Sequence, residues 1–178
     1  MGFADRYVCS LNASTLQDDE EHHAAEPLFA AAVADMTGAG LGALLCRVKY
    51  ADGTLHRMFE GNQQNMAQLL RIWTTAVIEK GKARRWVKNE DVAIAHGLYR
   101  RVAEASLAHW LDGRCKACSG TGVASLLGNR KCTPCTGSGT AVISHLCGYE
   151  KKIALDMVSE LMGLCDSHAR RAGARLRR

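Results

Sequence analysis

The clearest helical patterns lie in residues 64–80 and 89–111, where apolar side chains recur every three or four positions. This spacing places them on one face of a helix, which can pack against a core. The first stripe comprises Met66, Leu69, Leu70, Trp73, Val77 and Ile78. The second comprises Val92, Ile94, Ala95, Leu98, Val102, Ala105, Leu107 and Trp110. We expect Gly81 to end the first helix, Asn89 to cap the second, and Asp112-Gly113 to stop it.

Weaker patterns predict further elements on either side of these helices. A third long helix is expected over residues 149–171 and a short alanine-rich helix over residues 27–36, with Pro27 in its first turn. The glycine-rich segment 37–43 is expected to break the short helix, and residues 44–50 to be extended. Residues 123–127, 128–129 and 130–131 indicate a strand, a turn and a returning strand. The apolar members of the third helix include Ile153, Leu155, Met157, Val158, Leu161, Met162 and Leu164.

Two copies of one cysteine motif, C-x-x-C-x-G-x-G, follow the second helix. They read Cys115-Lys116-Ala117-Cys118-Ser119-Gly120-Thr121-Gly122 and Cys132-Thr133-Pro134-Cys135-Thr136-Gly137-Ser138-Gly139. Two such pairs complete the tetrahedral thiolate shell that a structural zinc ion prefers. Glycines allow the chain to turn through positive φ and bring its N–H groups close to sulfur. The predicted cofactor is a single structural Zn²⁺ held by Cys115, Cys118, Cys132 and Cys135.

Other readings of the cysteines are weaker. A redox C-x-x-C pair of thioredoxin type needs a βαβ setting, which the pattern does not provide. An iron–sulfur cluster also needs four cysteines, but paired knuckles are more typical of zinc. The four remaining cysteines have apolar neighbours or stand alone and are interpreted as small buried side chains: Cys9, Cys46, Cys147 and Cys165.

The chain of 178 residues is 47% hydrophobic and contains two prolines, a composition that suits a helical core. We predict a mainly α fold, a helical domain with an inserted four-cysteine zinc-binding β-hairpin module. The divisions are a flexible acidic arm (1–26), a helical domain with a helix-turn-helix-like pair (27–111), the zinc module (112–140), and a C-terminal helix with a basic tail (141–178). The sequence shows no membrane-spanning run and no signal peptide, so we expect a cytoplasmic protein without a membrane partner.

Charge is divided unevenly along the chain, whose net charge is +5. Residues 1–60 carry 9 acidic and 4 basic side chains, and the remainder carries 9 acidic and 19 basic. A basic majority suits a polyanion such as DNA, although a solvated basic face has the same composition. The candidate DNA-binding residues are Arg84, Arg85, Lys88, Arg100, Arg101, Arg114, Lys116, Arg130 and Lys131.

Catalytic motifs are missing from the sequence. It contains no H-E-x-x-H, G-x-S-x-G or phosphate-loop motif. The stretch Gly38-Ala39-Gly40-Leu41-Gly42-Ala43 fits a relaxed dinucleotide fingerprint, but a helical pattern rather than a strand precedes it. A closed four-thiolate zinc site also has no open position for catalysis. We therefore expect a protein that is not an enzyme.

The order of these features resembles the late-gene antitermination Q proteins of lambdoid phages, of the zinc-containing lambda type. The likeness rests on the glycine-rich segment 39–46 ending in Cys46, the helices at 65–80 and 89–110, and the two cysteine knuckles. The gap between the cysteine pairs is shorter than in that family. The resemblance implies a bacteriophage factor of the host cytoplasm that regulates transcription. Its partners would be double-stranded DNA near a late promoter, the β flap and σ of bacterial RNA polymerase, and nascent RNA.

Two other functions remain open on the sequence. The same cysteine motif builds the zinc-binding region of DnaJ-type co-chaperones, which bind unfolded polypeptides. That region has four copies, whereas this chain has two and lacks a His-Pro-Asp signature. A zinc-stabilised host-interaction protein without DNA binding is the third reading. Steeply salt-dependent DNA binding would separate the antitermination hypothesis from both.

Overall fold

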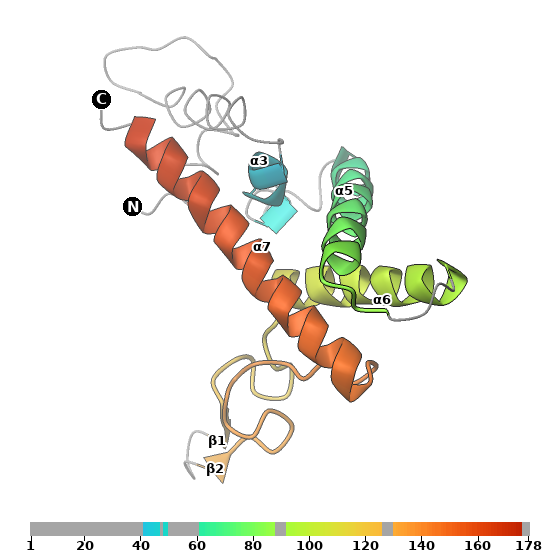
Figure 1. Cartoon of the computed structure of the whole chain (residues 1–178). Coiled ribbons are helices and arrows are strands. Elements are labelled where there is room, and N and C mark those ends of the chain that lie inside the picture. Colours follow the sequence, from blue (N-terminus) through green and yellow to red (C-terminus); the bar gives the residue numbers. More distant parts are fainter. Residues whose placement is uncertain (1–40, 47, 50–60, 88–91, 126–129, 176–178) are drawn as a thin grey trace, which may run out of the picture. The chain divides into compact units, whose positions relative to one another are not determined.

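The computed structural model describes residues 41–46, 48–49, 61–87, 92–125 and 130–175. The elements of this part are α3 (Leu41–Cys46), α5 (Gly61–Ala83), α6 (Val92–Leu111), β1 (Val123–Ser125), β2 (Arg130–Lys131) and α7 (Gly148–Arg175), as Figure 1 shows. The predicted mainly helical class is confirmed. The chain divides into two compact units, one of residues 1–72 and 160–178 and the other of residues 73–159.

The first unit contains α3, where the sequence predicts a break followed by an extended segment. The extended conformation is wrong for the described residues, because Leu41–Cys46 is helical, and residues 37–40 of the predicted break lie outside the described part of the chain. Leu44, Leu45 and Cys46 are all buried. A short run of apolar residues has no periodicity to distinguish helix from strand, and alanine and leucine favour helix.

In the second unit, α6 crosses the C-terminal half of α5 (Figure 1). Trp73 of α5 is 1% exposed, and its indole N–H donates to the Ser106 hydroxyl of α6 over 3.0 Å. The expectation that Gly81 ends α5 is wrong, because the helix continues to Ala83. A Cβ at Gly81 would lie 2.3 Å from Cε1 of Tyr99 and 2.8 Å from Cε3 of Trp86. The glycine therefore permits close packing of Tyr99 and Trp86 against α5 and does not terminate the helix.

The predicted apolar stripes are only partly buried. Leu69 and Val77 of α5 and Val102 and Trp110 of α6 are buried as expected. The exposed members contradict the prediction: Met66, Val92, Ile94, Leu155 and Met162. In α7, which extends the predicted third helix at both ends, Met157 and Leu161 are buried.

The strands pair in antiparallel register, with Val123 opposite Lys131 and Ser125 opposite Arg130. Several predictions lie outside the described residues: the arm 1–26 with Cys9, the helix 27–36, Lys88, the Asn89 cap and the turn 128–129. Within the described part of the chain, no helix has the length and apolar character needed to cross a bilayer.

Candidate metal centre

The two cysteine loops adopt the same backbone conformation. Ser119 and Thr136, which follow the second cysteine of each loop, have φ of 51° and 52°. The next residues, Gly120 and Gly137, have φ of 87° and 89°. Positive φ in consecutive residues turns the chain sharply around its cysteines, a conformation that glycine adopts at least cost.

The two loops also share the same pattern of backbone hydrogen bonds. The N–H of Gly120 donates to the carbonyl of Cys115, and that of Gly137 to the carbonyl of Cys132, both over 3.1 Å. Reciprocal bonds of 2.8 Å join the loops, from Cys115 N–H to the Gly139 carbonyl and from Cys132 N–H to the Gly122 carbonyl. The two loops are thus related as the halves of one symmetric unit.

Gly122 and Gly139 lie at the contact between the loops. A Cβ on Gly122 would lie 2.4 Å from the Gly137 carbonyl oxygen, and one on Gly139 would lie 2.3 Å from that of Gly120. Each glycine N–H also donates to a cysteine sulfur, Gly122 to Cys118 over 3.2 Å and Gly139 to Cys135 over 3.3 Å. The glycine requirement predicted from the motif is confirmed at both positions.

The four sulfurs converge at this contact. Their Sγ atoms all lie within 4.8 Å of one another, with 3.9 Å between Cys115 and Cys132 and 3.7 Å between Cys118 and Cys135. A tetrahedron with metal–sulfur bonds of about 2.3 Å has edges of about 3.8 Å. All four cysteines are at most 7% exposed. The cluster can therefore hold one metal ion, and four thiolates would fill a tetrahedral shell.

Electrostatics within the cluster favour a bound cation. Burial raises the pKa of the Cys132 thiol to about 12. Burial also acts to raise the pKa of Cys135, but N–H groups of Gly139 and Gly137 outweigh it and lower that pKa to about 6. Four neighbouring thiols cannot all ionise without a positive charge between them, because like charges disfavour one another. A metal ion supplies that charge and displaces the remaining protons.

The chain enters and leaves the cluster through one short backbone ladder. Arg114 and Thr140 form an isolated antiparallel bridge, and the Ala141 N–H donates to the Gly113 carbonyl over 2.8 Å. The two ends of the segment from residue 113 to residue 141 are therefore held together, which fixes the position of Cys115 relative to the end of α6.

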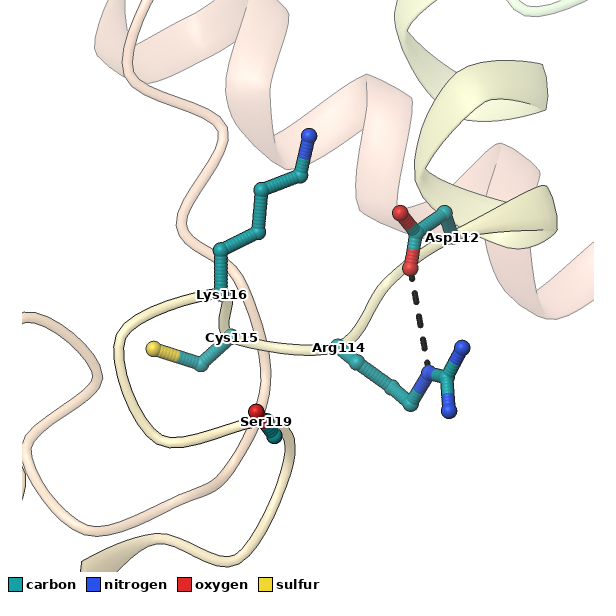
Figure 2. Close-up of a pocket in the computed structure, with 5 residues that line it drawn as sticks. All are labelled: Asp112, Arg114, Cys115, Lys116 and Ser119. Carbon is teal, nitrogen blue, oxygen red and sulfur yellow. Dashed lines mark ion pairs between the residues drawn. The ribbon is translucent and has the colours of Figure 1, made fainter.

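A shallow hollow of about 290 Å³ lies beside Cys115 (Figure 2). It is lined by Asp112, Arg114, Cys115, Lys116 and Ser119. Figure 2 shows the Arg114 and Lys116 side chains extending in different directions, with Arg114 paired to Asp112 at 3.8 Å. The hollow carries charges of both signs, from Asp112, Arg114 and Lys116.

The other predicted cations have varied surroundings. Three carry acidic partners: Arg84 pairs with Asp156, Arg100 with Glu104 at 2.8 Å, and Arg101 with Glu150 at 2.5 Å. Lys116, Arg130 and Lys131 are exposed around the cysteine loops, and the described structure contains no ion pair for them. Arg85, also exposed, has a φ of 51° and lies two residues after the end of α5.

The remaining cysteines divide into two kinds. Cys147 is exposed, which contradicts its interpretation as a buried side chain. Cys46 and Cys165 are buried as predicted, and their sulfurs lie 3.6 Å apart. Sequence reasoning missed this pairing, because 119 positions separate the two residues and no local spacing connects them.

Comparisons with protein-family models, with curated proteins and with solved structures give no match for this chain.

Proposed function

We propose that this chain is a phage-type transcription antitermination factor carrying one structural zinc ion. It would bind promoter-proximal DNA, engage bacterial RNA polymerase holoenzyme through the β flap and σ, and allow the enzyme to read through terminators and pauses. No reaction is catalysed in this proposal. The observation that carries it is a closed four-cysteine cluster, entered from a long helix and surrounded by exposed cations.

Zinc is the metal we assign to the cluster. Two C-x-x-C pairs with closely spaced, buried sulfurs are typical of structural zinc sites. The N–H groups of Gly122 and Gly139 supply the second layer of hydrogen bonds that steadies metal-bound thiolates. Because such a shell is closed, the zinc holds the loops in shape and leaves the surface residues to make contacts.

The contacts to DNA are assigned first to the cysteine loops. Arg114 and Lys131 each precede the first cysteine of a loop, and their aliphatic stems lie against Gly120 and Gly137 of the same loop, both about 3.4 Å from a Cβ built there. Each loop thus presents one long cation at an equivalent place. Lys116 and Arg130 add two more on the same module. Cations of this kind neutralise phosphates and position a protein on a duplex.

Arg101, one of the ion-paired arginines, is assigned a structural role as well. Arg101 bonds Glu150 through two nitrogens, at 2.5 Å and 3.4 Å, and thereby links α6 to the start of α7. Glu150 is only 12% exposed in its side chain, so reversing Arg101 would disturb this contact as well as any DNA contact. Lys116, Arg130 and Lys131 provide a cleaner test, since the described structure contains no ion pair that their reversal would break.

Transcription in vitro tests the whole proposal. The template carries the late promoter of the genome that encodes this chain, followed by a terminator, and the assay uses host polymerase with σ. We expect the zinc-loaded protein to increase read-through only when its promoter-proximal DNA is present. Absence of read-through with an active polymerase would overturn the antitermination function and favour binding of unfolded polypeptides or of another host protein.

DNA binding is tested separately by titration at several salt concentrations. We expect steep salt dependence, with the slope of log K against log salt lowered by about one for each phosphate contact removed. Lys116→Glu and Lys131→Glu should weaken binding to all sequences, whereas Arg170→Glu, at an exposed position of α7, should not. Equal affinity of all three variants would remove the cysteine loops from the interface.

A further inference from the structure

The pair Cys46 and Cys165 lies outside the metal cluster and is not used by the proposed function. Cys46 ends α3, and Cys165 lies in the part of α7 that belongs to the same compact unit. Their sulfurs are 3.6 Å apart, and their residues are 0% and 6% exposed. A disulfide has a sulfur–sulfur bond of about 2.05 Å, so small side-chain movements would bring these atoms to bonding distance.

Gly42 explains why the two sulfurs come so close. It lies one helical turn before Cys46, and a Cβ at this position would lie only 2.7 Å from Cβ of His168. His168 in turn lies three residues after Cys165, on the same face of α7. The missing side chain at Gly42 lets α3 approach α7, and the approach places one thiol against the other.

A lysine adds electrostatic support. Lys49 is half-buried, and burial lowers its pKa while nearby Cys165, Asp166 and Cys46 act to raise it. The interaction is mutual, because an ammonium group close to a thiol favours the thiolate, which is the reactive form in disulfide exchange.

We infer that Cys46 and Cys165 are a dithiol site that reacts with low-molecular-weight disulfides and closes reversibly into an intramolecular disulfide. Cys165, the more exposed of the two, attacks one sulfur of the small disulfide as a thiolate, and the departing thiolate takes up a proton. Cys46 then loses its proton and attacks the Cys165 sulfur, which releases the second small thiol. The two protein thiols lose two electrons, and one small disulfide is reduced to two thiols.

The consequence is a covalent link between α3 and α7 across 119 positions of sequence. In a reducing compartment such a bond is transient, and it forms when the pool of small disulfides rises. Its formation stabilises the first unit by restricting the unfolded chain. The site is independent of the proposed transcriptional function.

The test uses the full zinc-loaded chain with Cys147→Ser, which removes the exposed thiol, and glutathione disulfide as oxidant. Peptide mapping after alkylation should identify a Cys46–Cys165 link with retained zinc and a raised melting temperature. In Cys46→Ser, Cys165 should remain as a glutathione adduct and the melting temperature should not rise. The inference is overturned if both cysteines are alkylated as free thiols, if each ends as a separate adduct, or if oxidation is confined to other cysteines.

Two glycine variants check the geometry. Gly42→Ala should slow formation of the link about tenfold or more, because misplacement of reacting atoms by about 1 Å is costly. Gly163→Ala, in α7 with open space around the added methyl group, should leave the rate unchanged. Equal rates in both variants would contradict the role assigned to the close approach of α3 to α7. The Cys46→Ser experiment tests the dithiol site separately, whether or not Gly42→Ala folds.

Discussion

Two glycines of the first cysteine loop should respond very differently to the same substitution. Gly120 and Gly122 both have positive φ, at 87° and 78°. The nearest atoms to a Cβ at Gly120 would belong to the Arg114 side chain, at 3.4 Å, whereas a Cβ at Gly122 would lie 2.4 Å from the Gly137 carbonyl oxygen. We expect Gly120→Ala to cost about 1 kcal/mol through backbone strain and Gly122→Ala to cost about 3 kcal/mol, since it also overpacks the loop contact.

Chelator competition for zinc and thermal unfolding measure the difference between these variants. Because both glycines have positive φ and differ in their contact with the second loop, Gly120→Ala is the control for backbone strain. Equal losses of zinc affinity would show that the two loops do not meet as the structure has them.

Protons should compete with the metal mainly at Cys132. In the metal-free chain the raised pKa of Cys132, about 12, favours the folded state below the ordinary thiol pKa, and that contribution is lost as pH rises through about 12. The lowered pKa of Cys135, about 6, favours folding above the ordinary thiol pKa, and this contribution to stability is lost as pH falls through about 6.

Zinc must displace the proton of Cys132, so the apparent affinity for zinc should fall from about pH 8 to pH 6. Calorimetry in buffers of different ionisation enthalpy would measure the released protons, and a pH-independent affinity would contradict this expectation.

At the residue scale, local spacing made the convergence of the four cysteines predictable. Cys115 and Cys118 share one loop, as do Cys132 and Cys135, so each pair follows from a few backbone dihedrals. The pairing of Cys46 with Cys165 depends on how two distant helices pack, which a sequence pattern does not encode.

Among the elements, α5 and α7 each contain a glycine whose replacement tests packing against helix propensity. Alanine is favoured over glycine inside a helix by about 1 kcal/mol. Gly163→Ala should therefore stabilise α7, because nothing lies within 4 Å of the added methyl group. Gly81→Ala should destabilise the protein instead, because the methyl group would lie 2.3 Å from Tyr99.

Opposite signs in the free energy of unfolding, measured by denaturant titration, would support both assignments. If Gly81→Ala were also stabilising, the Tyr99 and Trp86 rings would not pack against α5 as described.

Helix periodicity located α5, α6 and α7, but it could not assign the role of single residues within them. Gly81 has the identity of a helix terminator, yet the aromatic rings beside it make it a packing residue. Val92 and Ile94 fit the apolar stripe of α6 and are nevertheless 68% and 60% exposed. The prediction for residues 41–46 was wrong for a different reason, since a six-residue apolar run is equally compatible with helix and strand.

At the scale of the whole molecule, one compact unit is a continuous stretch of the chain, and the other is assembled from two distant stretches. Both α5 and α7 contribute residues to each unit, with the divisions after Ile72 and Ser159. A division that falls inside helices leaves no glycine-rich or polar linker for sequence reasoning to detect.

Removing the metal should therefore act on one unit more than on the other. The amides of Cys132 and Gly137 are bonded within the cysteine loops, and structural zinc contributes on the order of 10 kcal/mol to the folding of small zinc modules. We expect a chelator, or Cys132→Ala, to speed hydrogen exchange at these amides about 100-fold or more. Buried positions of the first unit, such as Leu161 and Ala172, should keep their protection, because they belong to the other compact unit. Full metal content in Cys132→Ala would contradict a site shared by all four cysteines. Equal loss of exchange protection in both units would show that the metal supports the whole fold rather than one module.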